Sequence, residues 1–216
     1  LYEDANILAI EKPSGILVHP DAHSKEETVL DIFKKKYKKL ELVHRLDRET
    51  SGVMLLAKNE KAHEFLKRQF TERTVKKIYN AVVVGSVKND HGIINKPIGR
   101  SPADFRRRLA GRGARGEMRE AITEYKILKK FISEKEKFTL LEIKPKTGRT
   151  HQIRAHMKYL NHPVVCDALY NPKGPCPKNL KRLALHAVSI EFKNLKDQVK
   201  KVESSLPAEF KKTIKN

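Results

Sequence analysis

The sequence predicts an α+β fold with a mixed, mostly antiparallel sheet and a few flanking helices. Short apolar runs bounded by turn residues, which are typical of strands, outnumber the segments with helical periodicity. Strands and helices also do not alternate strictly, as a doubly wound parallel sheet would require. The chain has 216 residues, 39% of them hydrophobic, and no internal repeat or long linker. We therefore expect one domain over residues 1–216 with a sizeable core.

Six apolar segments are predicted as strands, because each is short and lies between turn-forming residues. In the last of them, every second residue from Ala184 to Phe192 falls on one face, the pattern of a half-buried strand. The six segments are Ile7–Ile10, Val53–Ala57, Ile78–Val84, Ile122–Leu128, Phe138–Ile143 and Leu183–Phe192.

Three segments are predicted as helices. The first begins at a capping box, SKEE, with Ser24 as the N-cap and Glu27 as the third helical residue. The second is capped by Asn59, and the third follows the turn at Gly148. The apolar residues at helical spacing are Leu30, Phe33 and Tyr37 in the first, Ala62, Phe65, Leu66 and Phe70 in the second, and Ile153, Met157 and Leu160 in the third.

Two basic segments lack a clear apolar period. Residues 97–120 hold seven arginines and three acidic residues, and the stretch from Lys193 to the end is rich in lysine. The arginine-rich segment is predicted to be irregular, either as a solvated loop or as a loop that becomes ordered on nucleic acid. The whole chain carries 46 Lys and Arg against 26 Asp and Glu, a net charge of +20, which favours the second alternative.

This charge also bears on partners and compartment. Nucleic acid is the first candidate partner and an anionic membrane surface the second. No apolar stretch approaches the roughly 18 residues of a membrane span, so we expect no membrane partner. Cys166 and Cys176 form no CxxC pair. They predict free thiols in a reducing, cytoplasmic compartment rather than a disulfide scaffold or a zinc ribbon.

The segment HRLDRETSG, residues 44–52, places Asp47 between Arg45 and Arg48 at the start of an apolar strand. Arg45 and Asp47 are two residues apart, so on an extended segment their side chains share a face. A cation beside Asp47 would keep the carboxylate ionised at neutral pH, as a nucleophile or an electrostatic stabiliser requires. An ordinary ion pair is the alternative interpretation.

A second cluster is KTGRTHQIRAH, residues 146–156. Basic residues, Arg149, His151 and Arg154, gather at the start of the third predicted helix, which is a favourable place for an anion. His151 and His156 are five apart, not the four that put two ligands on one helical face, so no metal site is predicted. The alternative is a surface helix with one charged face.

A third element is KKIYNAVVVG, where Tyr79 opens a predicted strand directly after basic residues. A tyrosine in a strand usually packs in the core or across the sheet, but in a nucleic-acid site it could stack on a base or transfer a proton. The sequence has no Walker loop, no GxGxxG before a helix and no paired carboxylates spaced for two metals. It therefore shows one candidate carboxylate and no sign of a cofactor.

Five motifs in order resemble those of the RluA-type pseudouridine synthase family: EKPSGILVHP, HRLDRETSG, KIYNAVVVG, GRTHQIRAH and RLALHA. The resemblance covers most of the chain, from about residue 2 to residue 192. The resemblance implies the catalytic fold of that family, with an RNA-binding cleft, and isomerisation of uridines in ribosomal or transfer RNA without cofactor or metal. We expect a monomer.

The resemblance also implies roles for single residues. Asp47 would be the catalytic aspartate, and Arg154 would pair with it and hold it ionised. Tyr79 would stack on the target uracil and accept the proton from C5. Arg45 would fill the gap that the flipped uridine leaves in the RNA, and Leu185 would pack against the base.

We add Arg149 as a phosphate contact and residues 97–120 as a loop that grips RNA. Many family members carry a small N-terminal RNA-binding domain, and none is visible here. The alternatives are a non-catalytic RNA-binding module of the same fold and an RNA base hydrolase. The hydrolase is disfavoured because no second carboxylate is available to activate water.

Overall fold

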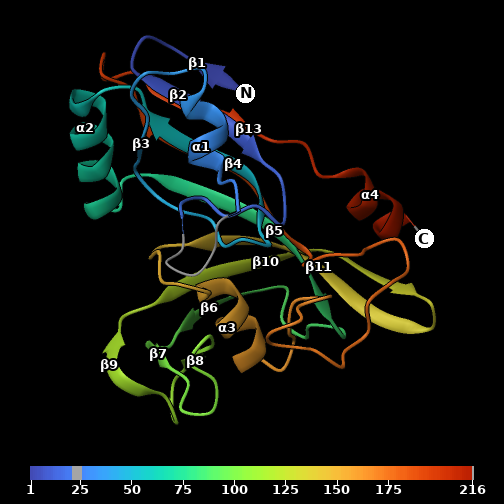
Figure 1. The fold of residues 1–216 in the computed structure, drawn as a ribbon. Helices are drawn as coiled ribbons and strands as arrows, with labels where there is room; N and C mark the ends of the chain where they lie inside the picture. The colour runs from blue at the N-terminus through green and yellow to red at the C-terminus, as the bar shows by residue number, and fades with distance from the viewer. Residues whose placement is uncertain (21–25, 216) are drawn as a thin grey trace. The chain divides into compact units, whose positions relative to one another are not determined.

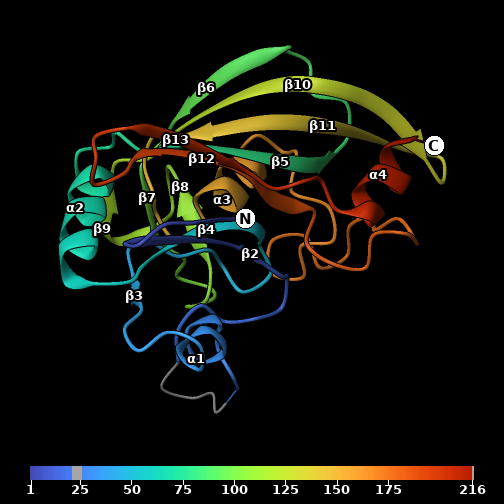
Figure 2. The same ribbon diagram turned by 90° about the horizontal axis from the view of Figure 1, so that it is seen from above.

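The computed structural model describes residues 1–20 and 26–215 (Figure 1, Figure 2). Over these residues it contains four helices and thirteen strands, and most of the strand pairs are antiparallel. The predicted α+β class is therefore confirmed. All six predicted strands are present, although their ends differ by a few residues.

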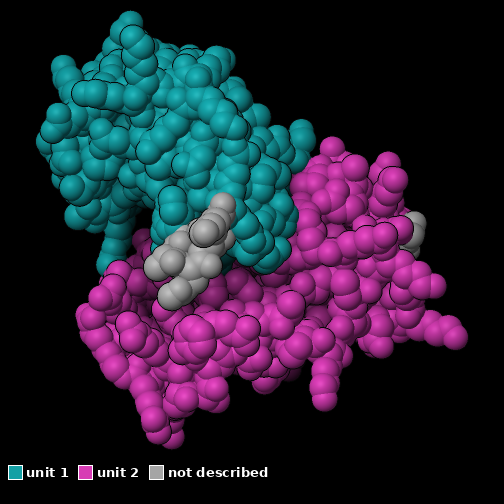
Figure 3. All heavy atoms as spheres, in the orientation of Figure 1, with its two compact units in different colours: residues 1–77, 186–205 teal, residues 78–185, 206–216 magenta. Residues whose placement is uncertain are grey.

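The chain divides into two compact units, each containing residues from two parts of the sequence (Figure 3). The single domain predicted over the whole chain stays a prediction. The first unit consists of residues 1–77 and 186–205, and the second of residues 78–185 and 206–216.

The first unit is built around β4 (Ser51–Ala57), all of whose residues are buried. Strand β2 (Ile7–Lys12) pairs antiparallel with one edge of β4. At the other edge, β3 (Glu41–Leu42) pairs with the end of β4, and β12 (Leu185–Lys193) runs parallel to its start. Strand β1 (Tyr2–Glu3) pairs with β2 and extends the sheet. Because β4 is covered on both faces, its sequence is continuously apolar after Gly52.

Gly52 permits the close approach of β4 and β12. Its φ is +115°, and a Cβ at this position would overlap the backbone of Ala187, with which it pairs. Only glycine combines this backbone conformation with the lack of a side chain. Further along its length, β12 pairs with β13 (Val199–Glu203), a strand within the stretch that the sequence left unpatterned.

The first predicted helix begins later than its sequence suggests. Helix α1 (Val29–Lys34) has Thr28 as its N-cap, and Thr28 and Asp31 form the capping box. Glu27 precedes the helix, and Ser24 lies outside the described residues. The sequence contains two consecutive capping-box patterns here, SKEE and TVLD, and the second includes Val29, the buried residue of the helix.

The second predicted helix is confirmed. Helix α2 (Glu60–Thr71) is capped by Asn59, whose side-chain oxygen accepts a 2.9 Å hydrogen bond from the N–H of Ala62. The helix buries Ala62, Leu66 and Gln69 against the sheet of the first unit. Gln69 also bonds both backbone groups of Lys193, which ties the helix to the end of β12.

The second unit contains an antiparallel sheet in the order β5–β11–β10–β6, seen from above in Figure 2. Helices α3 and α4 contact strands of this sheet. The bounds are Lys76–Val84 for β5, Glu136–Pro145 for β11, Ile122–Ser133 for β10, His91–Asn95 for β6, Gln152–Tyr159 for α3 and Ala208–Lys215 for α4.

The arginine-rich segment was predicted to be irregular, and this is wrong. Residues 98–119 form a separate three-stranded sheet in the order β8–β7–β9, which we call the arginine-rich sheet (Figure 1). Its strands are β7 (Ile98–Arg100), β8 (Arg108–Ala110) and β9 (Arg115–Arg119). Ile98 packs in a buried cluster with residues far along the chain, so its burial could not be read from the local pattern. The other buried members are Ala121, Ala155 and Tyr170.

The prediction of two free cysteines is also wrong. Cys166 and Cys176 form a disulfide, with an S–S distance of 2.01 Å and a Cα–Cα distance of 4.9 Å. Turns in the segment between the two cysteines bring them together. The N–H of Asn171 donates to the backbone oxygen of Asp167, and the N–H of Gly174 donates to the backbone oxygen of Asn171. The two cysteines therefore do not support a reducing compartment.

The basic C-terminal stretch is more ordered than its sequence suggests. Helix α4 buries Phe210 completely, and Arg182 pairs with Glu209 at 2.8 Å while its guanidinium stacks on the Phe210 ring. None of the helices in the described residues has the length and apolar character needed to cross a membrane.

Candidate active site

The HRLDRETSG motif forms a tight turn immediately before β4. Asp47 lies at the first position of the turn, and the N–H of Thr50 donates a 3.0 Å hydrogen bond to its backbone oxygen. The Asp47 side chain is half-buried, whereas Arg45 and Arg48 are exposed. Arg48 forms an ion pair with Glu26 at 2.8 Å, so one of the arginines beside Asp47 also serves the structure of the loop.

A buried lysine fixes this turn. The Nζ atom of Lys12 donates hydrogen bonds to the backbone oxygens of Pro13, Arg48 and Thr50 at 2.8, 2.8 and 2.9 Å. Lys12 is fully buried, and these three bonds match the three donors of an ammonium group. The carbonyls of Arg48 and Thr50 both belong to the Asp47 turn, which is thereby tied to the end of β2. Sequence reasoning missed this role, although a lysine at the end of an apolar strand was a visible signal.

A buried histidine holds the start of β4. The Nδ1 atom of His186 lies 2.7 Å from the hydroxyl of Ser51, and its Nε2 atom lies 3.0 Å from that of Ser204. His186 is buried, so both hydroxyl contacts satisfy ring nitrogens that water does not reach. The first residue of β4 is therefore fixed from the side of β12 as well.

The first residue of the motif, His44, has a structural role. Its Nε2 atom accepts a 2.9 Å hydrogen bond from the N–H of Leu55, and its ring stacks on Phe70 with centroids 4.7 Å apart. Burial, together with the positive charge of Lys77, lowers the pKa of His44 to about 3. In the neutral ring, Nε2 can accept the hydrogen bond from the N–H of Leu55.

Arg154 forms a buried fork with Asp167. Its Nε and Nη2 atoms each donate a 2.8 Å hydrogen bond to one carboxylate oxygen of Asp167. Both side chains are almost completely buried. Sequence reasoning missed Asp167, and an aspartate within the apolar stretch VVCDALY was the available signal.

Other polar residues of the second motif support the fold. Gln152 accepts hydrogen bonds from Thr147 and from the backbone of Arg149, and it donates to Thr123 and to the oxygen of Ile122. His156 lies 2.8 Å from the Thr123 hydroxyl, and burial lowers its pKa. The clustering of Gln152 and His156 that suggested a site is thus explained by internal bonding.

The remaining predicted residues also belong to the second unit. Tyr79 is buried in β5 opposite Ile143 of β11, and Leu185 is the buried first residue of β12. Asp47 and Arg45 belong to the first unit, so their meeting with Tyr79, Arg154 and Leu185 stays a prediction.

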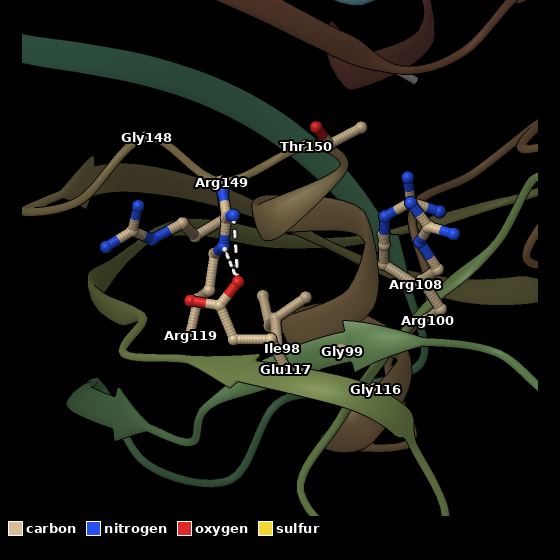
Figure 4. Close-up of a pocket in the computed structure, with 10 residues that line it drawn as sticks. All are labelled: Ile98, Gly99, Arg100, Arg108, Gly116, Glu117, Arg119, Gly148, Arg149 and Thr150. Atoms are coloured by element: carbon tan, nitrogen blue, oxygen red, sulfur yellow. Dashed lines mark hydrogen bonds and ion pairs between the residues drawn. The ribbon is translucent and has the colours of Figure 1, made fainter.

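The second unit contains a pocket of about 380 Å³ with an arginine-rich lining (Figure 4). Arg149 contributes from the turn before α3, and the arginine-rich sheet contributes the other cations. The sequence pointed to Arg149 and to residues 97–120 separately, and the structure brings them to one pocket. Glu117 pairs with Arg119 at 2.9 Å, which leaves an excess of positive charge. The three arginines from the sheet are Arg100, Arg108 and Arg119.

Comparison with known proteins adds to this geometry. The family profile described as RNA pseudouridylate synthase matches residues 6–159. An uncharacterized RNA pseudouridine synthase of Aquifex aeolicus is 44% identical over 190 residues, covering 83% of this chain and 58% of that protein. The ribosomal large subunit pseudouridine synthase D of Borreliella burgdorferi is 37% identical over 223 residues, covering 97% of this chain and 65% of that protein.

The fold agrees with these matches. The structure of human RNA pseudouridylate synthase domain containing 1 superposes with a TM-score of 0.81 at 25% identity, covering 95% of this chain and 82% of that one. The chain spans less than two thirds of the length of either bacterial relative. Because the profile covers most of the chain and the Borreliella protein matches nearly all of it, the chain belongs to the RluA-type RNA pseudouridylate synthase family.

Proposed function

We propose that the chain isomerises uridine to pseudouridine in structured RNA, with Asp47 as the catalytic group. One observation carries the proposal. In a chain of this family, Asp47 lies on a turn that Lys12 and the start of β4 hold in place. A half-buried carboxylate on a rigid support is suited to act on one atom of a bound substrate.

The reaction exchanges one bond for another. The N1–C1′ glycosidic bond breaks, the uracil turns, and a C5–C1′ bond forms. C5 then loses its hydrogen as a proton and N1 gains one, so nothing is oxidised or hydrolysed and no cofactor is required. Asp47 assists at the sugar, either by attacking C1′ or by removing the proton from C2′.

The other predicted residues have distinct roles in this scheme. Tyr79 stacks on the uracil and accepts the C5 proton. Arg154 pairs with Asp47 and keeps it ionised and oriented. The target uridine leaves its stack, at a cost of a few kcal/mol, while Arg45 fills the gap in the RNA and Leu185 packs against the flipped base.

We infer that the arginine-lined pocket binds the phosphates of this RNA. Four arginines line it, and phosphate contacts by cations supply most sequence-independent affinity. Phe105 precedes a run of three arginines and is 84% exposed, so its ring is available to stack on a base. The Borreliella relative is named for the large ribosomal subunit, which makes ribosomal RNA the first substrate to test and transfer RNA the second.

Release of tritium from C5-labelled uridine in RNA tests the proposal. Pseudouridine formation expels this hydrogen, whereas binding alone and base hydrolysis leave it on the uracil. We expect release by the wild-type chain and none by Asp47→Asn, which preserves shape and removes the charge. RNA binding without release would indicate a binding module, and free uracil would indicate a hydrolase. Release by Asp47→Asn at the wild-type rate would contradict the role of Asp47.

A further inference from the structure

Asp167 and Tyr170 enclose the guanidinium of Arg154, and neither belongs to the five motifs that carried the family resemblance. We propose that Asp167 and Tyr170 are positioning residues: they fix the orientation of Arg154 and connect it to the arginine-rich sheet. This inference rests on the proposed function, because it concerns the role of Arg154 in that reaction.

Asp167 holds the guanidinium in one plane. Two parallel hydrogen bonds of 2.8 Å, from Nε and Nη2 of Arg154 to the two carboxylate oxygens, determine its direction as well as its position. The carboxylate is itself fixed, because one of its oxygens also accepts the N–H groups of Leu169 and Tyr170 at 3.0 and 2.9 Å. The pair is buried, so water does not compete for these bonds.

Tyr170 supplies the second constraint. The central carbon of the Arg154 guanidinium lies 5.0 Å from the centroid of the Tyr170 ring, within the range of a cation–π contact. The hydroxyl of Tyr170 accepts a 2.8 Å hydrogen bond from the N–H of Arg108 in β8, and lies 3.2 Å from Nδ1 of His151. One buried side chain therefore joins Arg154 to a strand that lines the arginine-rich pocket.

This arrangement leads to a specific role. A guanidinium has five N–H donors, and the fork with Asp167 uses two of them. Because the fork fixes the plane of the guanidinium, the remaining N–H donors point in fixed directions. Asp167 thereby determines the orientation in which Arg154 can pair with a second carboxylate, that of Asp47 in the proposed reaction. The plainer interpretation is charge balance alone, since any buried arginine requires an anion. Charge balance affects stability, whereas positioning affects the rate through Arg154.

Two variants separate these interpretations. In Asp167→Asn, the amide oxygen can keep both backbone N–H bonds, while the amide nitrogen faces a donor of Arg154 and breaks the fork. In Tyr170→Phe, the ring stays over Arg154 and only the hydroxyl contacts with Arg108 and His151 are lost. Asp90→Asn and Tyr2→Phe are the matched controls. Asp90 is exposed, and Tyr2 belongs to the first unit, where its hydroxyl donates a 2.7 Å hydrogen bond to Asp4.

The measured quantity is the single-turnover rate of tritium release, with the RNA Kd determined separately. We expect Asp167→Asn to lower the rate about 10- to 100-fold, the range found when the outer partner of a ligand is removed at metal sites. Tyr170→Phe should lower it by a smaller factor, because the fork survives. For both variants and both controls, the RNA Kd should stay within about twofold of wild type, because none of these changes removes a cation from the pocket.

A double-mutant cycle tests whether Asp167 acts through Arg154. Arg154→Lys keeps the charge but cannot form the fork. If the proposal holds, adding Asp167→Asn to this background lowers the rate little further, whereas independent roles would give multiplicative losses. If Arg154→Lys does not fold, as judged by circular dichroism, the cycle uses Arg154→Gln.

A readout without turnover completes the test. The Nε–H proton of Arg154 should exchange slowly with solvent in wild type and quickly in Asp167→Asn, as measured by NMR. An unchanged rate in Asp167→Asn, or multiplicative losses in the cycle, would overturn the inference while leaving the proposed function intact. Failure of the wild-type chain to release tritium from any RNA would overturn the proposed function, and this inference with it.

Discussion

The ammonium of Lys12 donates a 2.8 Å hydrogen bond to the backbone oxygen of Arg48, 36 residues further along the chain. This contact and its counterpart to Thr50 immobilise the turn that carries Asp47. The side chain carries no reacting atom in the proposed mechanism. Lys12 belongs to the motif EKPSGILVHP and Asp47 to the motif HRLDRETSG. The first motif therefore supports the residue of the second that is proposed to be catalytic.

Replacing Lys12 by Met should destabilise the first unit. The substitution keeps an unbranched side chain that is one atom shorter but leaves buried carbonyls without a donor, at about 1–3 kcal/mol for an unsatisfied group. We expect the free energy of unfolding, measured with urea, to fall by roughly 2–4 kcal/mol. Lys61→Met on the exposed face of α2 is the control. Equal effects of the two substitutions would contradict the role of the buried ammonium.

The stability of the chain should fall with acid because of His44. Its pKa is lowered from 6.5 to about 3 in the folded state, so the unfolded state binds the proton first as the pH falls. The contribution is fully present above pH 6.5 and is lost between 6.5 and about 3, at up to about 1.4 kcal/mol per pH unit. His44→Gln should flatten this dependence in urea titrations between pH 7 and 5. A slope identical to that of wild type would refute the assignment.

Removing the disulfide should also lower stability. Closing a loop of about ten residues contributes roughly 2–3 kcal/mol by the chain-entropy relation. We expect Cys166→Ser, or treatment with a dithiol reductant, to lower the Tm by several degrees. Thiol titration of the unfolded, unreduced protein is the direct measurement. Two reactive thiols in that sample would show that the bond does not form.

Charge removal in the arginine-rich pocket should weaken RNA binding without sequence preference. Arg100→Ala and Arg149→Ala should each raise the RNA Kd and reduce the slope of log K against log salt by about 0.7–0.9. Lys61→Ala on α2 provides a control of equal charge change outside the pocket. An unchanged salt slope in both pocket variants would remove the pocket from the RNA-binding surface.

The sequence by itself determined what depends on neighbours along the chain. The six apolar strands, the Asn59 cap and the adjacency of Asp47 to its turn follow from local patterns, because a buried strand or a cap is specified by the residues within it. The five motifs pointed to the family for the same reason.

The tertiary structure alone decided what depends on residues far apart. The arginine-rich sheet forms because Ile98 of β7 is buried by partners more than twenty residues away, although β9 is exposed along its whole length. The Cys166–Cys176 bond and the pairing of Arg154 with Asp167 likewise require turns that bring two segments together. Composition and periodicity record which side chains are apolar or charged, whereas hydrogen bonds and ion pairs between distant residues exist only once the backbone has placed them within reach.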